Sequence, residues 1–124
     1  MRRISAHEVC WDARGSIHVL HAGAEWRELV YVTSRAGSRR GDHYHAQCRE
    51  LIVLLSGRAS LQVRTVDGGQ VHRSELGAME GVVFEPGEAH ALTAIEDTCW
   101  IAARSLACDP GADDMVRCVV EEAE

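Results

Sequence analysis

Apolar and polar residues alternate in short runs along most of this chain, a pattern typical of β-strands with one buried face. Turn residues separate the runs, among them Asp67-Gly68-Gly69, whose glycines tolerate positive φ angles, and Asp109-Pro110-Gly111. No stretch has the period of an amphipathic helix, so the pattern predicts an all-β barrel or sandwich. We predict strands at 16–20, 25–34, 51–56, 58–66, 70–73, 82–85, 89–95, 98–104 and 115–120.

The first fifteen residues lack this alternation. We expect residues 1–15 to form an irregular lead-in that Trp11 anchors to the core. With 124 residues the chain is long enough to bury one core and short for two, so we predict a single domain over 1–124.

Charge and hydropathy exclude several kinds of partner. The net charge is −6, and no basic run is longer than a pair of arginines, so we expect no nucleic-acid partner. No apolar stretch reaches the ~18 residues that cross a bilayer, so we expect no membrane partner. The amino terminus lacks the apolar stretch of a signal peptide, and we therefore expect a cytoplasmic protein.

The cysteines and the missing lysines narrow the chemistry further. The five cysteines form no Cys-x-x-Cys pair, so in the cytoplasm they are expected to be free thiols. Cys48 is interpreted as a small turn residue, with a ligating or redox-sensitive thiol as the alternative. The chain contains no lysine, which excludes Schiff-base catalysis by a side chain.

Candidate metal ligands gather in the stretch 37–57, GSRRGDHYHAQCRELIVLLSG. His43 and His45 stand two residues apart, so in a strand both side chains project from the same face. A turn then leads to Glu50, at the start of the next strand, and His90 begins a later strand after a Pro-Gly turn. Two neutral imidazoles and a carboxylate suit zinc, iron, manganese or nickel and leave positions on the metal for water or substrate.

This spacing resembles the two sequence motifs of the cupin family. Residues 37–57 match the first cupin motif at each of its defining positions, and residues 81–94 are similar to the second. Three peripheral positions of the second motif differ from the usual pattern: Val82, the single Pro86 and Ala94. The resemblance implies a single-domain cupin jelly-roll β-barrel, also called a double-stranded β-helix. It further implies one divalent transition metal (Fe, Zn, Mn or Ni) held by His43, His45, Glu50 and His90.

A second, weaker resemblance concerns the kind of cupin. The sequence RGDHYH at 40–45 resembles the R-G-x-H-x-H of cupins in nucleotide-sugar metabolism, including 3,4-ketoisomerases and the cupin domains of capsular polysaccharide enzymes. Those ketoisomerases generally work without metal, whereas this chain keeps Glu50 and His90. The resemblance therefore implies a small polar substrate more strongly than it implies that reaction.

A divalent ion with open positions can polarise a carbonyl or stabilise an enolate. We therefore favour an enzyme with isomerase, epimerase or cyclase chemistry on a small-molecule substrate. Tyr31, His72 and Glu28 are the candidates for proton transfer. Arg39 and Arg40 can bind an anionic group bidentately, although both also suit a solvated loop.

Three alternatives remain open. An iron ion at the site would also bind oxygen, which corresponds to an iron-dependent cupin oxygenase. A non-catalytic cupin would use the pocket only to bind a ligand or metal, and a purely structural metal is the third alternative. The cupin resemblance also implies a homodimer that exchanges or pairs edge strands, and residues 1–20 have the apolar and aromatic content to take part.

Overall fold

The computed structural model describes residues 1–21, 25–105 and 114–121. Within these ranges the chain forms strands and no helix, which confirms the all-β prediction. The strands are β1 (Arg2–Ser5), β2 (His7–Asp12), β3 (Gly15–Val19), β4 (Glu28–Ser34), β5 (Arg39–His45), β6 (Glu50–Ser56), β7 (Ala59–Thr65), β8 (His72–Leu76), β9 (Glu80–Phe84), β10 (Glu88–Ala94), β11 (Thr98–Arg104) and β12 (Met115–Arg117). The described residues contain no helix that could cross a membrane.

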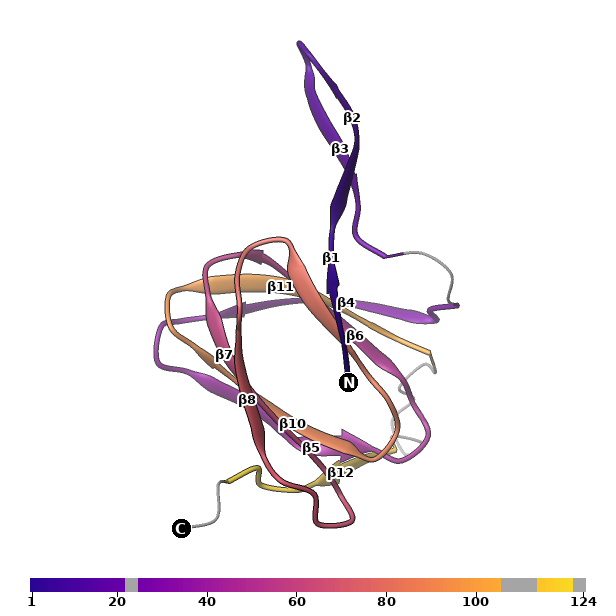
Figure 1. The fold of residues 1–124 in the computed structure, drawn as a ribbon, viewed down its shortest axis with the longest axis vertical. Coiled ribbons are helices and arrows are strands. Elements are labelled where there is room, and N and C mark those ends of the chain that lie inside the picture. The colour runs from indigo at the N-terminus through magenta and orange to yellow at the C-terminus, as the bar shows by residue number, and fades with distance from the viewer. Residues whose placement is uncertain (22–24, 106–113, 122–124) are drawn as a thin grey trace.

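Ten of the strands form two antiparallel sheets that face each other (Figure 1). One sheet has the strand order β1-β9-β6-β11-β4 and the other has the order β12-β5-β10-β7-β8. The main core lies between them, because its buried residues come from both sheets. These residues are Ile52, Leu54, Ala59, Leu61, Val63, Leu76, Val82, Phe84, Leu92, Trp100 and Ala102.

The central strand β6 explains why one run of the sequence is apolar without alternation. Its inward residues Ile52 and Leu54 join the main core. Its outward residues Leu51 and Val53 lie in a second cluster on the outer face of the same sheet, partly covered by Trp26. A strand buried on both faces reads as a continuous apolar run, and this run places Glu50 at its buried end.

The prediction of an irregular lead-in over residues 1–15 is wrong. β1 pairs with β9 at the edge of the first sheet, and β2 and β3 form a hairpin that projects from the body (Figure 1). Trp11 is 76% exposed and anchors nothing in the described chain. β1 and β2 are held by backbone pairing and bury few side chains, so they carry no pattern of burial. The strand predicted at 16–20 is confirmed as β3 with its ends shifted by one residue.

Other predictions differ from the structure only at element ends. The predicted final strand 115–120 ends at Arg117, and the strand predicted at 70–73 begins at His72. The turn predicted at Asp109-Pro110-Gly111 lies outside the described residues. Four of the five cysteines are free, as expected, and Cys108 also lies outside the described residues.

Two glycines fix how closely the strands approach. Gly57 follows β6 with φ +83, and a Cβ atom there would clash with the Asp97 carbonyl oxygen. Gly41 lies in β5 with φ +102, and its Cβ would lie 2.6 Å from the carbonyl oxygen of His90. The close approach at Gly41 brings β5 against β10 beside His43.

We expect Gly57→Ala to lower the free energy of unfolding by about 3 kcal/mol, because it combines an unfavourable φ with a backbone clash. Gly37→Ala is the matched control: its φ is +87, but no atom lies within 4 Å of the added Cβ. It should cost only about 1 kcal/mol. Urea unfolding of both variants measures the difference, and equal losses would contradict the clash.

Candidate metal centre

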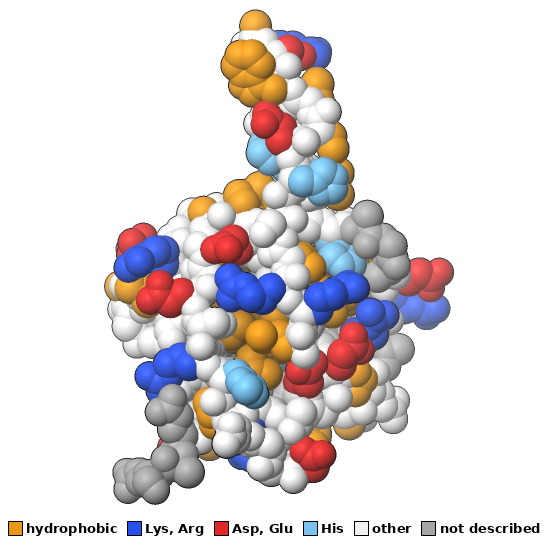
Figure 2. Space-filling model, in the orientation of Figure 1, with side chains coloured by type: hydrophobic (Ala, Val, Ile, Leu, Met, Phe, Trp, Pro, Cys, Tyr) orange, Lys and Arg blue, Asp and Glu red, His pale blue; other side chains and the backbone are white. Residues whose placement is uncertain are grey.

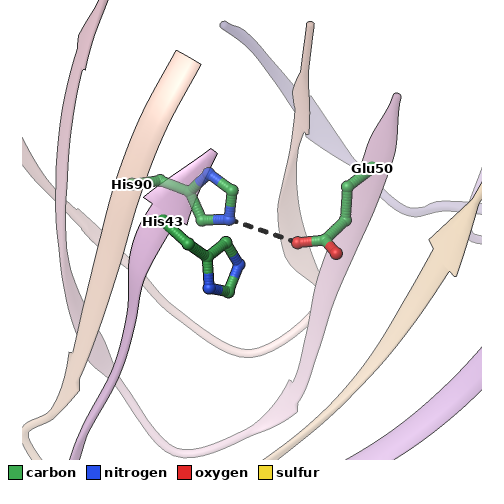
Figure 3. A group of neighbouring side chains, drawn as sticks. All are labelled: His43, Glu50 and His90. Atoms are coloured by element: carbon green, nitrogen blue, oxygen red, sulfur yellow. Dashed lines mark ion pairs between the residues drawn. The ribbon is translucent and has the colours of Figure 1, made fainter. Parts of the chain in front are cut away.

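Strand pairing brings two of the predicted ligands together. His43 on β5 and His90 on β10 are direct partners in the antiparallel register of the second sheet. Glu50 stands at the start of β6 in the opposite sheet, where it pairs with Phe84 and Arg104. Its carboxylate therefore reaches the two imidazoles across the interior (Figure 3).

The three side chains are close enough to share one ion. One ligand atom from each of His43, Glu50 and His90 lies within 4.8 Å of the other two. His90 Nε2 is 3.3 Å from Glu50 Oε1, and the rings of His43 and His90 meet edge to face with centroids 4.9 Å apart. The His90 ring also stacks on Phe84 at 3.9 Å, which fixes its plane.

The hydrogen bonds of His90 define which nitrogen is available. Its Nδ1 lies 3.0 Å from the carbonyl oxygen of Glu88, and a carbonyl can only accept, so Nδ1 carries the proton. In the neutral ring Nε2 then holds a lone pair. Nε2 is buried and has no hydrogen-bond partner among the described residues. A lone pair facing the Glu50 carboxylate needs a cation or a proton between them, and a metal ion fits this arrangement.

His45, the fourth predicted ligand, lies beside these three and also has a second set of neighbours. Its Nε2 is 3.3 Å from Glu50 Oε2 and has no hydrogen-bond partner among the described residues. Its Nδ1 is 2.9 Å from Asp114 Oδ1. His45, Cys48 and Asp114 form a separate group of potential ligands within 4.8 Å of one another.

Burial and charge shift the titration of these groups in different directions. Burial, reinforced by the neighbouring His90 ring, lowers the pKa of His43 to about 4. Burial alone would raise the pKa of Glu50, but its neighbours His45, His90 and Arg104 hold it well below its ordinary value. Burial opposes protonation of His45, yet Glu50 and Asp114 outweigh it and raise its pKa.

Three of the four candidate ligands, His43, Glu50 and His90, line a cavity of about 300 Å³ between the sheets, and His45 is not among its lining residues. This volume is at the lower end of the range for small-molecule sites. The remaining wall is mostly apolar, with arginines at two places. The lining residues are Val30, Val32, Arg40, Gly41, His43, Glu50, Ile52, His90, Leu92, Trp100, Ala102, Arg104 and Met115.

Of the two arginines predicted to bind substrate, Arg40 lines this cavity. It donates hydrogen bonds to Ser34 Oγ at 2.8 Å and to the Thr33 carbonyl at 2.9 Å. Arg39 projects elsewhere and is held by Asp42 and by Gln62 Oε1. The structure therefore places only one of them at the cavity.

The residues predicted to transfer protons do not line the cavity. Tyr31 is 64% exposed, and His72 is exposed on the edge strand β8. Glu28 contacts a residue of the cavity wall: it accepts a hydrogen bond at 2.9 Å from the guanidinium of Arg104, and Arg104 lines the cavity.

Two residues of the centre were not among the predicted ones. Arg104 donates from Nε to Glu50 Oε2 at 2.9 Å, and Asp114 bonds to His45. Arg104 has a sequence signal, since it continues the inward register of Trp100 and Ala102 on β11. Asp114 has none, because nothing in its acidic surroundings distinguishes it from a solvated charge.

Comparison with protein families assigns most of the chain to a domain of polysaccharide biosynthesis. The family model described as the polysaccharide biosynthesis C-terminal domain matches residues 10–103. No curated protein matches the sequence.

Solved structures with the same fold include enzymes of nucleotide-linked sugars, and they confirm the cupin jelly-roll fold. The capsular polysaccharide assembling protein CapF from Staphylococcus aureus is 20% identical with TM-score 0.72, over 94% of this chain and 32% of its own. The dTDP-4-dehydrorhamnose 3,5-epimerase from Sulfolobus tokodaii is 20% identical with TM-score 0.76, over 90% of this chain and 73% of its own. The sugar 3,4-ketoisomerase QdtA from Thermoanaerobacterium thermosaccharolyticum, in complex with TDP, is 16% identical with TM-score 0.75, over 94% of this chain and 86% of its own. The chain thus spans about a third of the length of CapF.

In metal-free protein we expect the His43 ring to titrate at about pH 4 rather than near its ordinary value, because burial disfavours the imidazolium. The contribution of His43 to the free energy of unfolding then falls as the pH drops from the ordinary histidine pKa toward 4, because the unfolded chain binds a proton at His43 before the folded protein does. NMR titration of the ring protons measures the midpoint. Glu50→Gln should lower it further by removing a negative charge, and a midpoint near 6.5 would contradict the expectation.

Proposed function

Because the chain belongs to the polysaccharide biosynthesis C-terminal domain family, we propose that it is a metal-dependent cupin enzyme that isomerises or epimerises a nucleotide-linked sugar. The observation that carries this proposal is the convergence of His43, Glu50 and His90 within 4.8 Å at one end of a cavity. These residues come from three strands of two sheets, so the arrangement is set by the whole fold.

The chemistry of the donors supports a divalent transition metal. His43, Glu50 and His90 would hold it, with His45 as the fourth ligand, because two of these imidazoles present a buried Nε2 without a hydrogen-bond partner in the described chain. A bound ion of this kind polarises a carbonyl and stabilises the negative charge that develops when the neighbouring carbon loses a proton. Arg104 keeps the Glu50 carboxylate charged and oriented toward the interior.

The rest of the cavity suits a small polar substrate with an anionic group. Arg40 lies on the wall and supplies a guanidinium for a phosphate or carboxylate. Trp100 and Val32 supply a flat apolar surface for a sugar ring. The fold is shared with an epimerase and a ketoisomerase of nucleotide-linked sugars, which supports this substrate class.

A non-catalytic binding module is the second candidate, and one observation favours it. Among the described residues of the cavity wall, the acidic and basic side chains are the proposed ligands His43, Glu50 and His90 and the two arginines. A side chain that is free to move a proton to or from carbon is therefore missing from the described wall. As a binding module, the protein would use the same pocket to bind a metal and a ligand and would not convert the ligand.

We expect purified protein to bind about one equivalent of a divalent first-row metal per chain. His90→Ala and Glu50→Gln should each weaken binding at least ~10-fold, because each removes a donor. His72→Ala is the matched control, since this histidine is exposed outside the cavity. Isothermal titration with Zn²⁺ and Mn²⁺ after chelation measures the affinities. Undiminished binding in both site variants would refute the centre.

An enzyme and a binding module differ in whether they exchange a hydrogen of the substrate with solvent. An isomerase or epimerase should exchange a carbon-bound hydrogen of TDP-4-keto-6-deoxyglucose, which is bound in a QdtA structure, with deuterium from solvent. Binding of the same compound without exchange or product would favour the binding module. Oxygen uptake with Fe²⁺ and substrate would instead indicate the oxygenase.

We also propose that the chain forms a homodimer through its hairpin. β2 and β3 expose Val9 (55%), Trp11 (76%) and Ile17 (60%), and Figure 2 shows hydrophobic side chains on this projection. A two-stranded hairpin is marginally stable alone in water, so a partner surface would stabilise it. The outer face of the first sheet offers a hollow of about 360 Å³ lined by residues that include Trp26 and Leu29.

We expect Trp11→Ser to shift the protein from dimer toward monomer, because it removes the largest exposed apolar side chain of the hairpin. Size-exclusion chromatography with light scattering over a concentration series measures the mass. Val66→Ser removes an exposed apolar residue that follows β7 in the other sheet and serves as the comparison. A wild-type protein that is monomeric at every concentration would refute the dimer.

A further inference from the structure

We propose that Asp114 is a positioning residue that fixes the tautomer of His45, so that His45 Nε2 presents its lone pair to the metal centre. This inference rests on the proposed metal site. It concerns a residue that lies immediately before β12 and outside residues 10–103, to which the family model matches. The carboxylate of Asp114 therefore comes from a part of this chain that the family comparison does not cover.

The contacts of Asp114 account for both of its oxygens. Oδ1 lies 2.9 Å from His45 Nδ1. Oδ2 accepts the backbone N–H groups of Gln47 at 2.7 Å and Cys48 at 2.6 Å. The backbone adds a third link, since the N–H of Ala46 donates to the Asp114 carbonyl at 3.1 Å. One residue thus holds both the imidazole and the turn that leads to Glu50.

These contacts determine which nitrogen of His45 carries the proton. A carboxylate only accepts, so the neutral His45 ring must donate from Nδ1 to Asp114. Nε2 is then unprotonated, and it is the nitrogen that lies 3.3 Å from Glu50 Oε2. Hydrogen bonding of the non-ligating nitrogen is how proteins set the orientation and basicity of a metal-binding histidine. His90 is arranged in the same way, with the Glu88 carbonyl in place of the carboxylate.

The last described segment holds Asp114 in place. β12 pairs with β5 in a register that sets Met115 opposite His45. Farther along, the N–H of Val120 donates to Asp42 Oδ1 at 3.0 Å, and Val120 is fully buried. The segment 114–121 is therefore attached to β5 by two carboxylates, of which only Asp114 contacts a proposed ligand.

The same atoms also allow a second metal site, since His45, Cys48 and Asp114 lie within 4.8 Å of one another. The positioning role explains the observed contacts better. Both Asp114 oxygens already accept hydrogen bonds, and an ion would have to displace them. The Cys48 sulfur lies 3.1 Å from the Arg49 carbonyl, as a protonated thiol would.

Asp114→Asn tests the proposal sharply. The backbone N–H groups of Gln47 and Cys48 can only donate, so the new amide must turn its oxygen to them and its NH₂ toward His45. Nδ1 then becomes an acceptor, and the neutral ring moves its proton to Nε2. Asp42→Asn is the matched control, because it alters the other carboxylate attachment without touching His45 and keeps a residue that tolerates its φ of 57.

The first readout is the ring ¹⁵N spectrum of metal-free protein, at a pH where His45 is neutral. We expect an Nδ1–H tautomer in the wild type and in Asp42→Asn, and an Nε2–H tautomer in Asp114→Asn. The second readout is metal affinity by titration, where Asp114→Asn should bind ~10–100-fold more weakly and the control should be unchanged.

An Nε2–H tautomer in the wild type would overturn the proposal even if the variant fails to fold. Equal affinity of Asp114→Asn and wild type would overturn it as well. Loss of a second equivalent of Zn²⁺ in Cys48→Ser would show that the cluster is a metal site instead. If the wild type binds no metal, the proposed function fails, while the tautomers still decide whether Asp114 orients His45.

Discussion

The buried carboxylate of Glu50 is the constraint on which the centre depends. It is 3% exposed, and a charge so far from water is stable only when it is paired and hydrogen-bonded. Arg104 donates to one oxygen at 2.9 Å, and an imidazole nitrogen faces each oxygen at 3.3 Å. Those imidazole nitrogens present lone pairs in their neutral tautomers, so the pairing is completed only by a proton or by a metal ion.

The fold makes this arrangement by joining parts of the chain that are distant in sequence. β6 is buried on both faces, and Glu50 at its start is therefore buried as well. The direct pairing of His43 with His90 depends on a close approach of β5 to β10, which only a glycine at position 41 allows. A local change in strand packing would separate the ligands before it unfolded the core.

The sequence was sufficient for the all-β fold and for the residues that converge, because alternation and motif spacing are local properties. It was sufficient for β3, which overlaps the strand predicted at 16–20, but insufficient for β1 and β2, since strands that are held by backbone pairing and bury few side chains leave no pattern of burial. The same limit applies to the site. Alternation along β11 places Arg104 on the same face as Trp100 and Ala102, but nothing along the chain shows that Tyr31 faces solvent, because that depends on which face of β4 the opposite sheet covers.

Charge around the histidines favours a metal ion over a single proton. Among the described residues Glu28, Glu50 and Asp114 bring three negative charges to this network, and Arg104 brings one positive charge. Protonation of His45 would leave a net negative charge in a largely buried region, whereas a divalent cation would balance it. The lowered pKa of His43 points the same way, because a ring that resists protonation remains a ligand at neutral pH. The balance of charge therefore supports the proposed divalent cation at this site.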